Sequence, residues 1–189
     1  MRVSVGSVAG NIKVTWQAPL DDGGSPIIGY QLSLDGNLVY DGSSSASSTG
    51  YSFHNLSIGR DYTLTVVAIN AIGRSEAAQL VTPAASVPNR PISIKANNAT
   101  SSEIEIAWTV ASFNGGASVS SYKVRRDSGP GTPYKPEIDI LDPNVKVYKF
   151  SGLTAALRYT FQVQSVNLVG ASDWSTATVF PAAAAPGSV

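Results

Sequence analysis

The chain has 189 residues, of which 43% are hydrophobic and 14% charged, and 13 Lys and Arg balance 13 Asp and Glu. This is a globular composition that is long enough for roughly one to two domains, and the zero net charge removes the electrostatic attraction that nucleic-acid binding requires. The lack of cysteine excludes a disulfide framework, thiol catalysis and zinc fingers. No apolar run approaches the roughly 18 residues of a membrane span. We therefore expect no nucleic-acid partner and no direct insertion into a membrane.

The predicted elements are short strands. Apolar and polar residues alternate with a period of two in residues 12–16 and 62–68, and again in residues 104–108 and 159–163. This alternation is typical of half-buried β-strands, and no window sustains the stripe of an amphipathic helix. The pattern predicts an all-β fold of several short strands joined by tight turns.

An internal repeat divides the chain into two copies of this pattern. The landmarks are separated by 92 residues in the first part of each copy and by 97 residues in the second part, so the second copy contains an insertion. Residues 128–136 are rich in Gly and Pro, which indicates that the insertion lies in a surface loop. The matched landmarks are Trp16 with Trp108, Tyr30 with Tyr122, Leu56 with Leu153, and Tyr62 with Tyr159.

The repeat predicts two domains, at residues 1–85 and 86–189. The second is expected to contain a longer loop at about residues 128–144 and to end in a linker that is rich in alanine. Pro83, Pro88 and Pro91 are expected to stiffen the connection between the domains.

The landmarks resemble those of a fibronectin type III domain. An early Trp16 is followed by the run Asp22–Tyr30, by Leu56 six residues before Tyr62, and by Asn70–Ser75, and the second copy has the same order. The resemblance implies two consecutive antiparallel immunoglobulin-like β-sandwiches of about seven strands each, as an excerpt of a longer multidomain array.

The resemblance also implies structural roles for four aromatic residues. Trp16 and Trp108 are expected to fill the space between the two sheets of each sandwich. Tyr62 and Tyr159 are expected to form tyrosine corners, in which the ring is buried and the hydroxyl bonds to nearby backbone.

Catalytic and metal-binding groups are scarce. His54 is the single histidine and is expected to face solvent on its strand, with no glycine elbow around a serine to accompany it. The acidic residues Glu137, Asp139 and Asp142 lack the spacing of a calcium-binding loop and are expected to be hydrated. We therefore expect a non-enzymatic protein with no catalytic residue, metal or cofactor.

A candidate protein-binding patch lies in the first copy. Alternation from Tyr62 places Val67 and Ile69 on the outer side of their strand, and Ile28 aligns with an outward position on the neighbouring strand. Together they predict an exposed apolar patch. The corresponding residues of the second copy are Ser120, Gln164 and Val166.

Two other groups of residues are interpreted through the resemblance. The loops after Trp108 and Asn167 are expected to face the preceding domain, which makes candidate interdomain contacts of Phe113, Leu168, Val169 and Trp174. Lys123, Arg125 and Arg126 are considered as a site for heparin or an acidic partner. Because Lys123 and Arg125 are expected on the outer face of one sheet and Lys149 on the other sheet, we interpret the basic residues as solvated strand faces.

The predicted function is that of a structural spacer and protein–protein interaction module, of the adhesion or scaffold type, that is monomeric and contacts adjacent domains of its own chain. An extracellular or cell-surface location is favoured, and Asn55 and Asn98 match the N-glycosylation pattern. The alternatives are an intracellular cytoskeletal or titin-like scaffold module and an accessory domain of a carbohydrate-active enzyme. The last would need an exposed aromatic platform, for which Tyr40, Tyr134 and Trp174 are scattered candidates.

Overall fold

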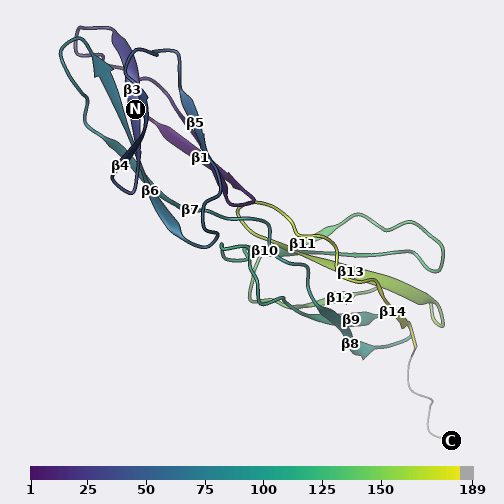
Figure 1. Ribbon diagram of the computed structural model, residues 1–189. Coiled ribbons are helices and arrows are strands. Elements are labelled where there is room, and N and C mark those ends of the chain that lie inside the picture. The colour runs from purple at the N-terminus through teal and green to yellow at the C-terminus, as the bar shows by residue number, and fades with distance from the viewer. Residues whose placement is uncertain (184–189) are drawn as a thin grey trace, which may run out of the picture. The chain divides into compact units, whose positions relative to one another are not determined.

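The computed structural model describes residues 1–183, which form strands and connecting turns with no helix among them (Figure 1). The chain divides into two compact units, a first unit of Met1–Ser86 and a second unit of Val87–Val189. Within the described residues, each unit packs a three-stranded against a four-stranded antiparallel sheet. The prediction of two sandwiches of about seven strands each is therefore confirmed.

The first unit has the sheet orders β1-β2-β5 and β4-β3-β6-β7. Its longest strand, β6, alternates buried and half-buried residues along most of its length, as the period of two predicts. Its strands are β1 (Val3–Val8), β2 (Asn11–Trp16), β3 (Ile27–Leu34), β4 (Asn37–Gly42), β5 (Gly50–Phe53), β6 (Asp61–Asn70) and β7 (Ala78–Pro83).

The second unit repeats this topology, with the sheet orders β12-β9-β8 and β11-β10-β13-β14. One strand, β11, lies inside the segment that the sequence predicts as a long loop. The expected C-terminal linker falls largely on residues 184–189, which lie outside the described residues. The strands are β8 (Ser93–Ala99), β9 (Ile104–Thr109), β10 (Ser121–Arg126), β11 (Ile138–Ile140), β12 (Val147–Phe150), β13 (Arg158–Val166) and β14 (Thr178–Pro181).

A tryptophan lies at the centre of each core. Trp16 is 4% exposed and Trp108 is 5% exposed. Each indole packs edge-on against a buried tyrosine of the facing sheet, with ring centroids 5.6 Å apart for Trp16 and Tyr30 and 5.3 Å apart for Trp108 and Tyr122. Burial raises the pKa of both tyrosine hydroxyls. The aromatic pairs therefore join the two sheets of each unit.

Buried tyrosines also fix the turn before the long strand of each unit. The hydroxyl of Tyr62 accepts a hydrogen bond from the backbone N–H of Ser57 at 3.0 Å. In the second unit the hydroxyl of Tyr159 accepts one from the N–H of Thr154 at 2.8 Å. Each ring is thus held in the core while its polar end satisfies a turn amide, which is the geometry of a tyrosine corner.

An aspartate that sequence reasoning missed performs a related task in both units. Asp35 Oδ1 accepts the backbone N–H of Thr63 at 2.9 Å, and Asp127 Oδ1 accepts that of Thr160 at 3.0 Å. Asp127 is only 5% exposed and also accepts the N–H of Gly129 at 3.2 Å. These carboxylates join the end of one strand to the start of the next strand in the sheet.

Replacing Asp127 with alanine is expected to lower the free energy of unfolding of the second unit by about 1–3 kcal/mol, because two backbone N–H groups lose their acceptor where solvent access is limited. Asp127→Asn keeps a side-chain oxygen in the same place and should cost less. Urea denaturation of the two variants measures the difference. Equal losses would mean that the negative charge, and not the acceptor oxygen, is what the site requires.

Candidate functional site

The outer face of the four-stranded sheet in the first unit carries the predicted apolar patch. On β6, Val67 lies opposite Gln31 and Ile69 lies opposite Gly29. Both are half-buried on the side of the strand that faces away from the core. Ile28 is 43% exposed and lies at a shift in the β3–β6 register, directly beside the Gly29–Ile69 pair. The register thus brings the three residues to one end of the same strand pair.

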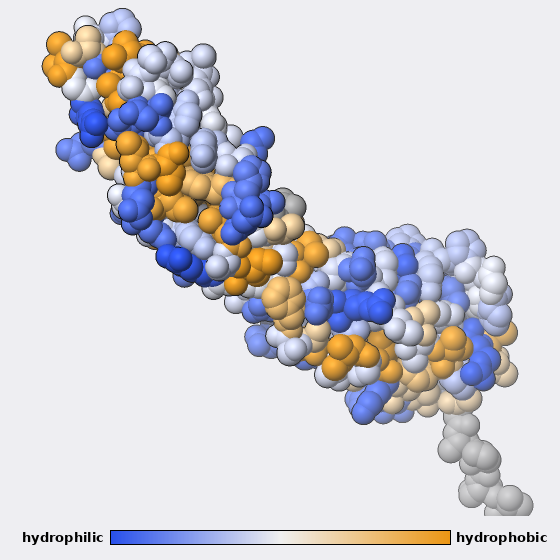
Figure 2. Space-filling view, in the orientation of Figure 1, coloured by the Kyte–Doolittle hydropathy of each residue, from blue (hydrophilic) through white to orange (hydrophobic). Residues whose placement is uncertain are grey.

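The same face extends to the edge strand β7. Val81 is 59% exposed and pairs with Thr63, which faces outward from β6. Sequence reasoning missed Val81, because the alternation in β7 alone does not tell which side of the strand faces the core. In the space-filling view, apolar and polar side chains are interspersed over the visible side of the first unit (Figure 2).

A charged group borders the patch on β4. Asp41 pairs with Gln31, the residue that also lies opposite Val67. Hydrogen bonds from the side chain of Ser43, the side chain of Gln31 and the backbone of Ser43 lower the pKa of the Asp41 carboxyl, and the positive charge of Arg74 adds to the effect. The patch therefore has a carboxylate at its rim that stays ionised at neutral pH.

The outer face of the four-stranded sheet in the second unit is built differently, around one arginine. The Arg125 guanidinium donates hydrogen bonds to Gln162 Oε1, at 3.2 Å from Nε and 2.7 Å from Nη2. It lies 3.8 Å from the ring centroid of Trp174 and 4.1 Å from that of Tyr134. We call this group the Arg125 stack; its cation–π contacts involve two aromatic residues.

Hydrogen bonds from β13 fasten the irregular segment that carries Trp174. Two serine hydroxyls of this segment accept backbone N–H groups of β13, and two glutamine side chains of β13 donate to carbonyls of the segment. The bonds are Val163 N to Ser175 Oγ (3.0 Å), Ser165 N to Ser172 Oγ (3.1 Å), Gln162 Nε2 to Ser175 O (3.0 Å) and Gln164 Nε2 to Ser172 O (2.7 Å).

Sequence reasoning treated Tyr134 and Trp174 as scattered aromatics and did not find that both contact Arg125. They are 40 residues apart, and one of them lies in the inserted loop, so no local spacing joins them. Next to the stack, Lys123 pairs with Glu137 at 2.7 Å and lies 3.9 Å from Asp139. The hydrogen bond and charge of Glu137 raise the pKa of the Lys123 ammonium.

The residues considered for catalysis or metal binding do not form a single cluster. His54 is exposed beside β5. Glu137 and Asp139 face Lys123, whereas Asp142 accepts hydrogen bonds from Asn144 in its own turn. Within residues 1–183, no three His, Cys, Asp or Glu side chains gather closely enough to hold a metal ion.

The candidate interdomain residues have different surroundings within the second unit. Phe113 is 43% exposed and Leu168 is 62% exposed, and Val169 is half-buried. Trp174 is occupied by its contact with Arg125. The interdomain role of these four residues stays a prediction.

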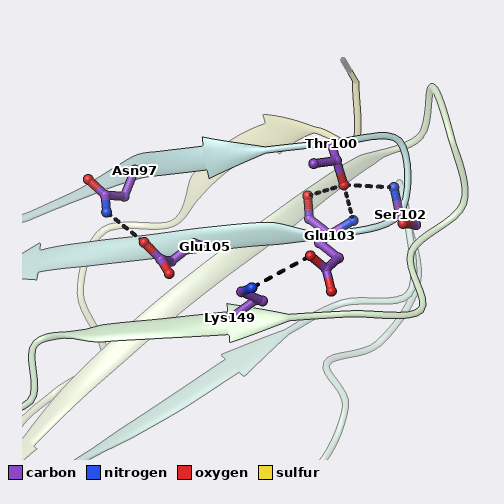
Figure 3. Close-up of polar contacts among 6 residues, drawn as sticks. All are labelled: Asn97, Thr100, Ser102, Glu103, Glu105 and Lys149. Atoms are coloured by element: carbon purple, nitrogen blue, oxygen red, sulfur yellow. Dashed lines mark hydrogen bonds and ion pairs between the residues drawn. The ribbon is translucent and has the colours of Figure 1, made fainter.

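Both candidate glycosylation sites lie on exposed turns or strands. Asn55 adopts a left-handed backbone with φ of 57°, and Asn98 lies on β8. The Thr100 hydroxyl of the second site accepts the N–H groups of Ser102 and Glu103 at 3.3 Å and 3.0 Å, which closes the turn after β8 (Figure 3). Both asparagines are exposed.

A sequence model of one protein family matches both units. The model described as fibronectin type III domain matches residues 1–83 and 88–180. Among the solved structures that share the fold are domains from titin, with a TM-score of 0.68 and 18% identity; the match covers 95% of this chain and 60% of that one. The FN1–FN3 domains of chicken CNTN1 match with a TM-score of 0.61 and 17% identity, over 97% of this chain and 66% of that one. No helix among the described residues is long and apolar enough to cross a membrane.

Similar curated proteins are much longer than this chain. Netrin receptor DCC of Mus musculus is 29% identical over 88% of this chain and 12% of its own length. Myomesin-2 of Homo sapiens is 29% identical over 64% of this chain and 8% of its own length. Chitinase A1 of Niallia circulans is 27% identical over 88% of this chain and 23% of its own length. The chain therefore spans less than a quarter of these relatives.

Proposed function

Because the chain belongs to the fibronectin type III family, with two consecutive domains, we propose that it is a non-enzymatic structural spacer and protein-interaction module of a longer protein. A netrin receptor and myomesin-2 are among its relatives, which supports an adhesion or scaffold role. The observation that carries the interaction role is the apolar patch of Ile28, Val67 and Ile69 on the outer sheet face of the first unit.

The patch is not a requirement of the fold. The second unit has the same topology, yet it places Ser120 and Gln164 where the first unit has Ile28 and Val67. These apolar side chains point outward and add nothing to the core, and the second unit folds without them. Exposed apolar side chains of this kind favour association with another surface. We propose that this face binds the protein partner, with the ionised Asp41 at its rim helping to select it.

The internal comparison also supplies a test. The double variant Ile28→Ser/Val67→Gln transfers the residues of the second unit onto the first and is expected to fold normally. Immobilised wild-type chain, incubated with an extract of its source, should retain a protein that the double variant loses. Lys13→Ser, on the opposite sheet, is the control and should retain it. Retention by the double variant as well would remove this face as the partner site.

We place the parent protein at the cell surface, in line with the similarity to a netrin receptor. An intracellular scaffold is the alternative, because the relatives include intracellular muscle proteins as well as cell-surface receptors and because the chain has no cysteine. Glycan attached to Asn55 or Asn98 in material from the native source would support the surface location. Fully unmodified asparagines in that material would favour the intracellular one.

A second candidate function rests on the Arg125 stack. Tyr134 and Trp174 lie on the same outer face, and a chitinase is among the relatives. The alternative function is therefore that of an accessory domain that binds an insoluble polysaccharide. Cosedimentation with chitin separates the two functions. Under the leading proposal the chain stays in the supernatant; retention on chitin that Trp174→Ala abolishes would favour the second.

A further inference from the structure

A small basic hollow lies at the open edge of the second unit. It has a volume of about 210 Å³ and lies where the edge strands of the two sheets, β11 and β12, approach each other. Its lining contains three basic residues, an apolar floor and no acidic residue. The principal lining residues are Arg126, Lys135, Lys149, Ile138, Tyr148 and Phe150.

Arg126 has spare hydrogen-bonding capacity in this hollow. On β10 it follows the buried Tyr122 and Val124 at intervals of two, so it points to the inner side of the sheet. Its guanidinium lies 5.2 Å from the ring centroid of Tyr159 and donates one hydrogen bond, at 2.8 Å, to the carbonyl of Asp127. A guanidinium has five N–H donors, and the others have no acceptor among the described residues.

Two further cations border the hollow. Lys135 is exposed in the inserted loop, and its backbone N–H is bonded to the Arg126 carbonyl at 2.8 Å, which holds the loop against the end of β10. Lys149 lies on β12 with its ammonium 3.7 Å from the Glu103 carboxylate on the outer face (Figure 3). A ligand can therefore bind Arg126 and Lys135 without displacing a carboxylate of the protein, whereas Lys149 is already paired with Glu103.

The first unit shows that these charges are additions to the fold. The residue of the first unit that corresponds to Arg126 is Leu34, because Arg126 pairs with Phe161 and Leu34 pairs with Leu64. The residue that corresponds to Lys149 is Ser52, because Lys149 pairs with Glu105 and Ser52 pairs with Lys13. Leu34 packs against the core of the first unit. An arginine in place of this leucine gives up apolar burial, and the residue that accompanies it, Lys135, comes from the insertion.

We propose that the hollow is a binding site for an extended acidic peptide segment, with a carboxylate on Arg126 and Lys135 and an apolar side chain on the Tyr148 and Phe150 floor. Among the described strands β12 pairs only with β9, so its free edge offers backbone groups to an added strand. The guanidinium suits a carboxylate because its N–H donors form a planar fork.

The surrounding charges favour a short acidic segment over a long sulfated polysaccharide. Glu103 lies on one side of the hollow, beside Lys149, and Glu137 and Asp139 lie on the other, beside Lys123. A polyanion that extends beyond the hollow meets these carboxylates and is repelled, whereas a peptide with one or two acidic residues is not.

A titration of the isotopically labelled chain tests the proposal. The probe is the capped peptide Val-Glu-Val-Glu-Val, which carries two acidic residues. The same peptide with Lys in place of Glu and a heparin oligosaccharide are the comparison ligands. The Glu peptide should shift the NMR signals of β11, β12 and residues 135–136, and added salt should weaken the effect. Arg126→Leu, which installs the residue of the first unit, should weaken binding roughly tenfold or more.

Two further variants keep the outcome clear. Lys135→Gln, in an exposed loop, should weaken binding several-fold and decides the matter if Arg126→Leu does not fold. Arg158→Leu removes an exposed charge elsewhere in the second unit and should change the affinity less than about twofold. Absent shifts, equal binding of the Lys peptide, shifts with the oligosaccharide alone, or full affinity in folded Arg126→Leu would each overturn the proposal. None of these results affects the patch of the first unit.

Discussion

Replacing Trp108 with alanine is expected to lower the free energy of unfolding of the second unit by about 3–5 kcal/mol. The indole is 5% exposed and contacts Tyr122 across the two sheets, so its removal leaves a large cavity that the facing strands cannot close. Domains are stable by only about 5–15 kcal/mol, and the loss is therefore a large part of the total. Hydrogen exchange of the amides in β9, β10 and β13 should become much faster.

A matched variant tests whether the loss follows the size of the cavity. The Nε1 of Trp108 is buried and has no hydrogen-bond partner in the described residues, so Trp108→Phe removes volume only and should cost less than half of the alanine loss. Trp16→Ala should have the corresponding effect on β2, β3 and β6. Unchanged amide protection in β9 and β10 of Trp108→Ala would refute the assignment of this residue to the core.

The fold was predictable because its determinants are local or repeated. Alternation with a period of two marks the strands, and the recurrence of Trp16 at Trp108 and of Tyr62 at Tyr159 identifies two copies of one sandwich. Each of these residues packs in the same way in both units, so a pattern seen twice in the sequence corresponds to one physical solution used twice.

The proposed binding surfaces were less predictable because they depend on neighbours that are distant in sequence. The Arg125 stack needs Tyr134 from the inserted loop and Trp174 from the segment that β13 fastens. The basic hollow needs the edges of two different sheets to approach each other. One signal was nevertheless present: Arg126 lies two residues after Val124, at an inward position of an alternating strand, where a charge is unexpected.

Replacing Gly29 with alanine is expected to destabilise the first unit by about 3 kcal/mol, at the upper end of what overpacking costs, because the obstructing atoms belong to the backbone. A Cβ at this position would overlap the Gly42 carbonyl oxygen and lie 2.6 Å and 2.7 Å from the carbonyl carbon and Cα of Ser43. The backbone of Gly29 does not have a positive φ, so the cost is steric and not conformational. Urea denaturation measures it.

Gly6→Ala is the control, since a Cβ on Gly6 of β1 meets nothing within 4 Å and its backbone is also ordinary. It should leave stability unchanged or raise it by about 0.4–1 kcal/mol, because alanine restricts the unfolded chain. Equal effects of the two substitutions would contradict the close approach of β4 to β3. Since Gly29 pairs with Ile69, Gly29→Ala should also displace the patch and weaken partner binding, whereas Ile28→Ser/Val67→Gln should weaken binding and leave stability intact.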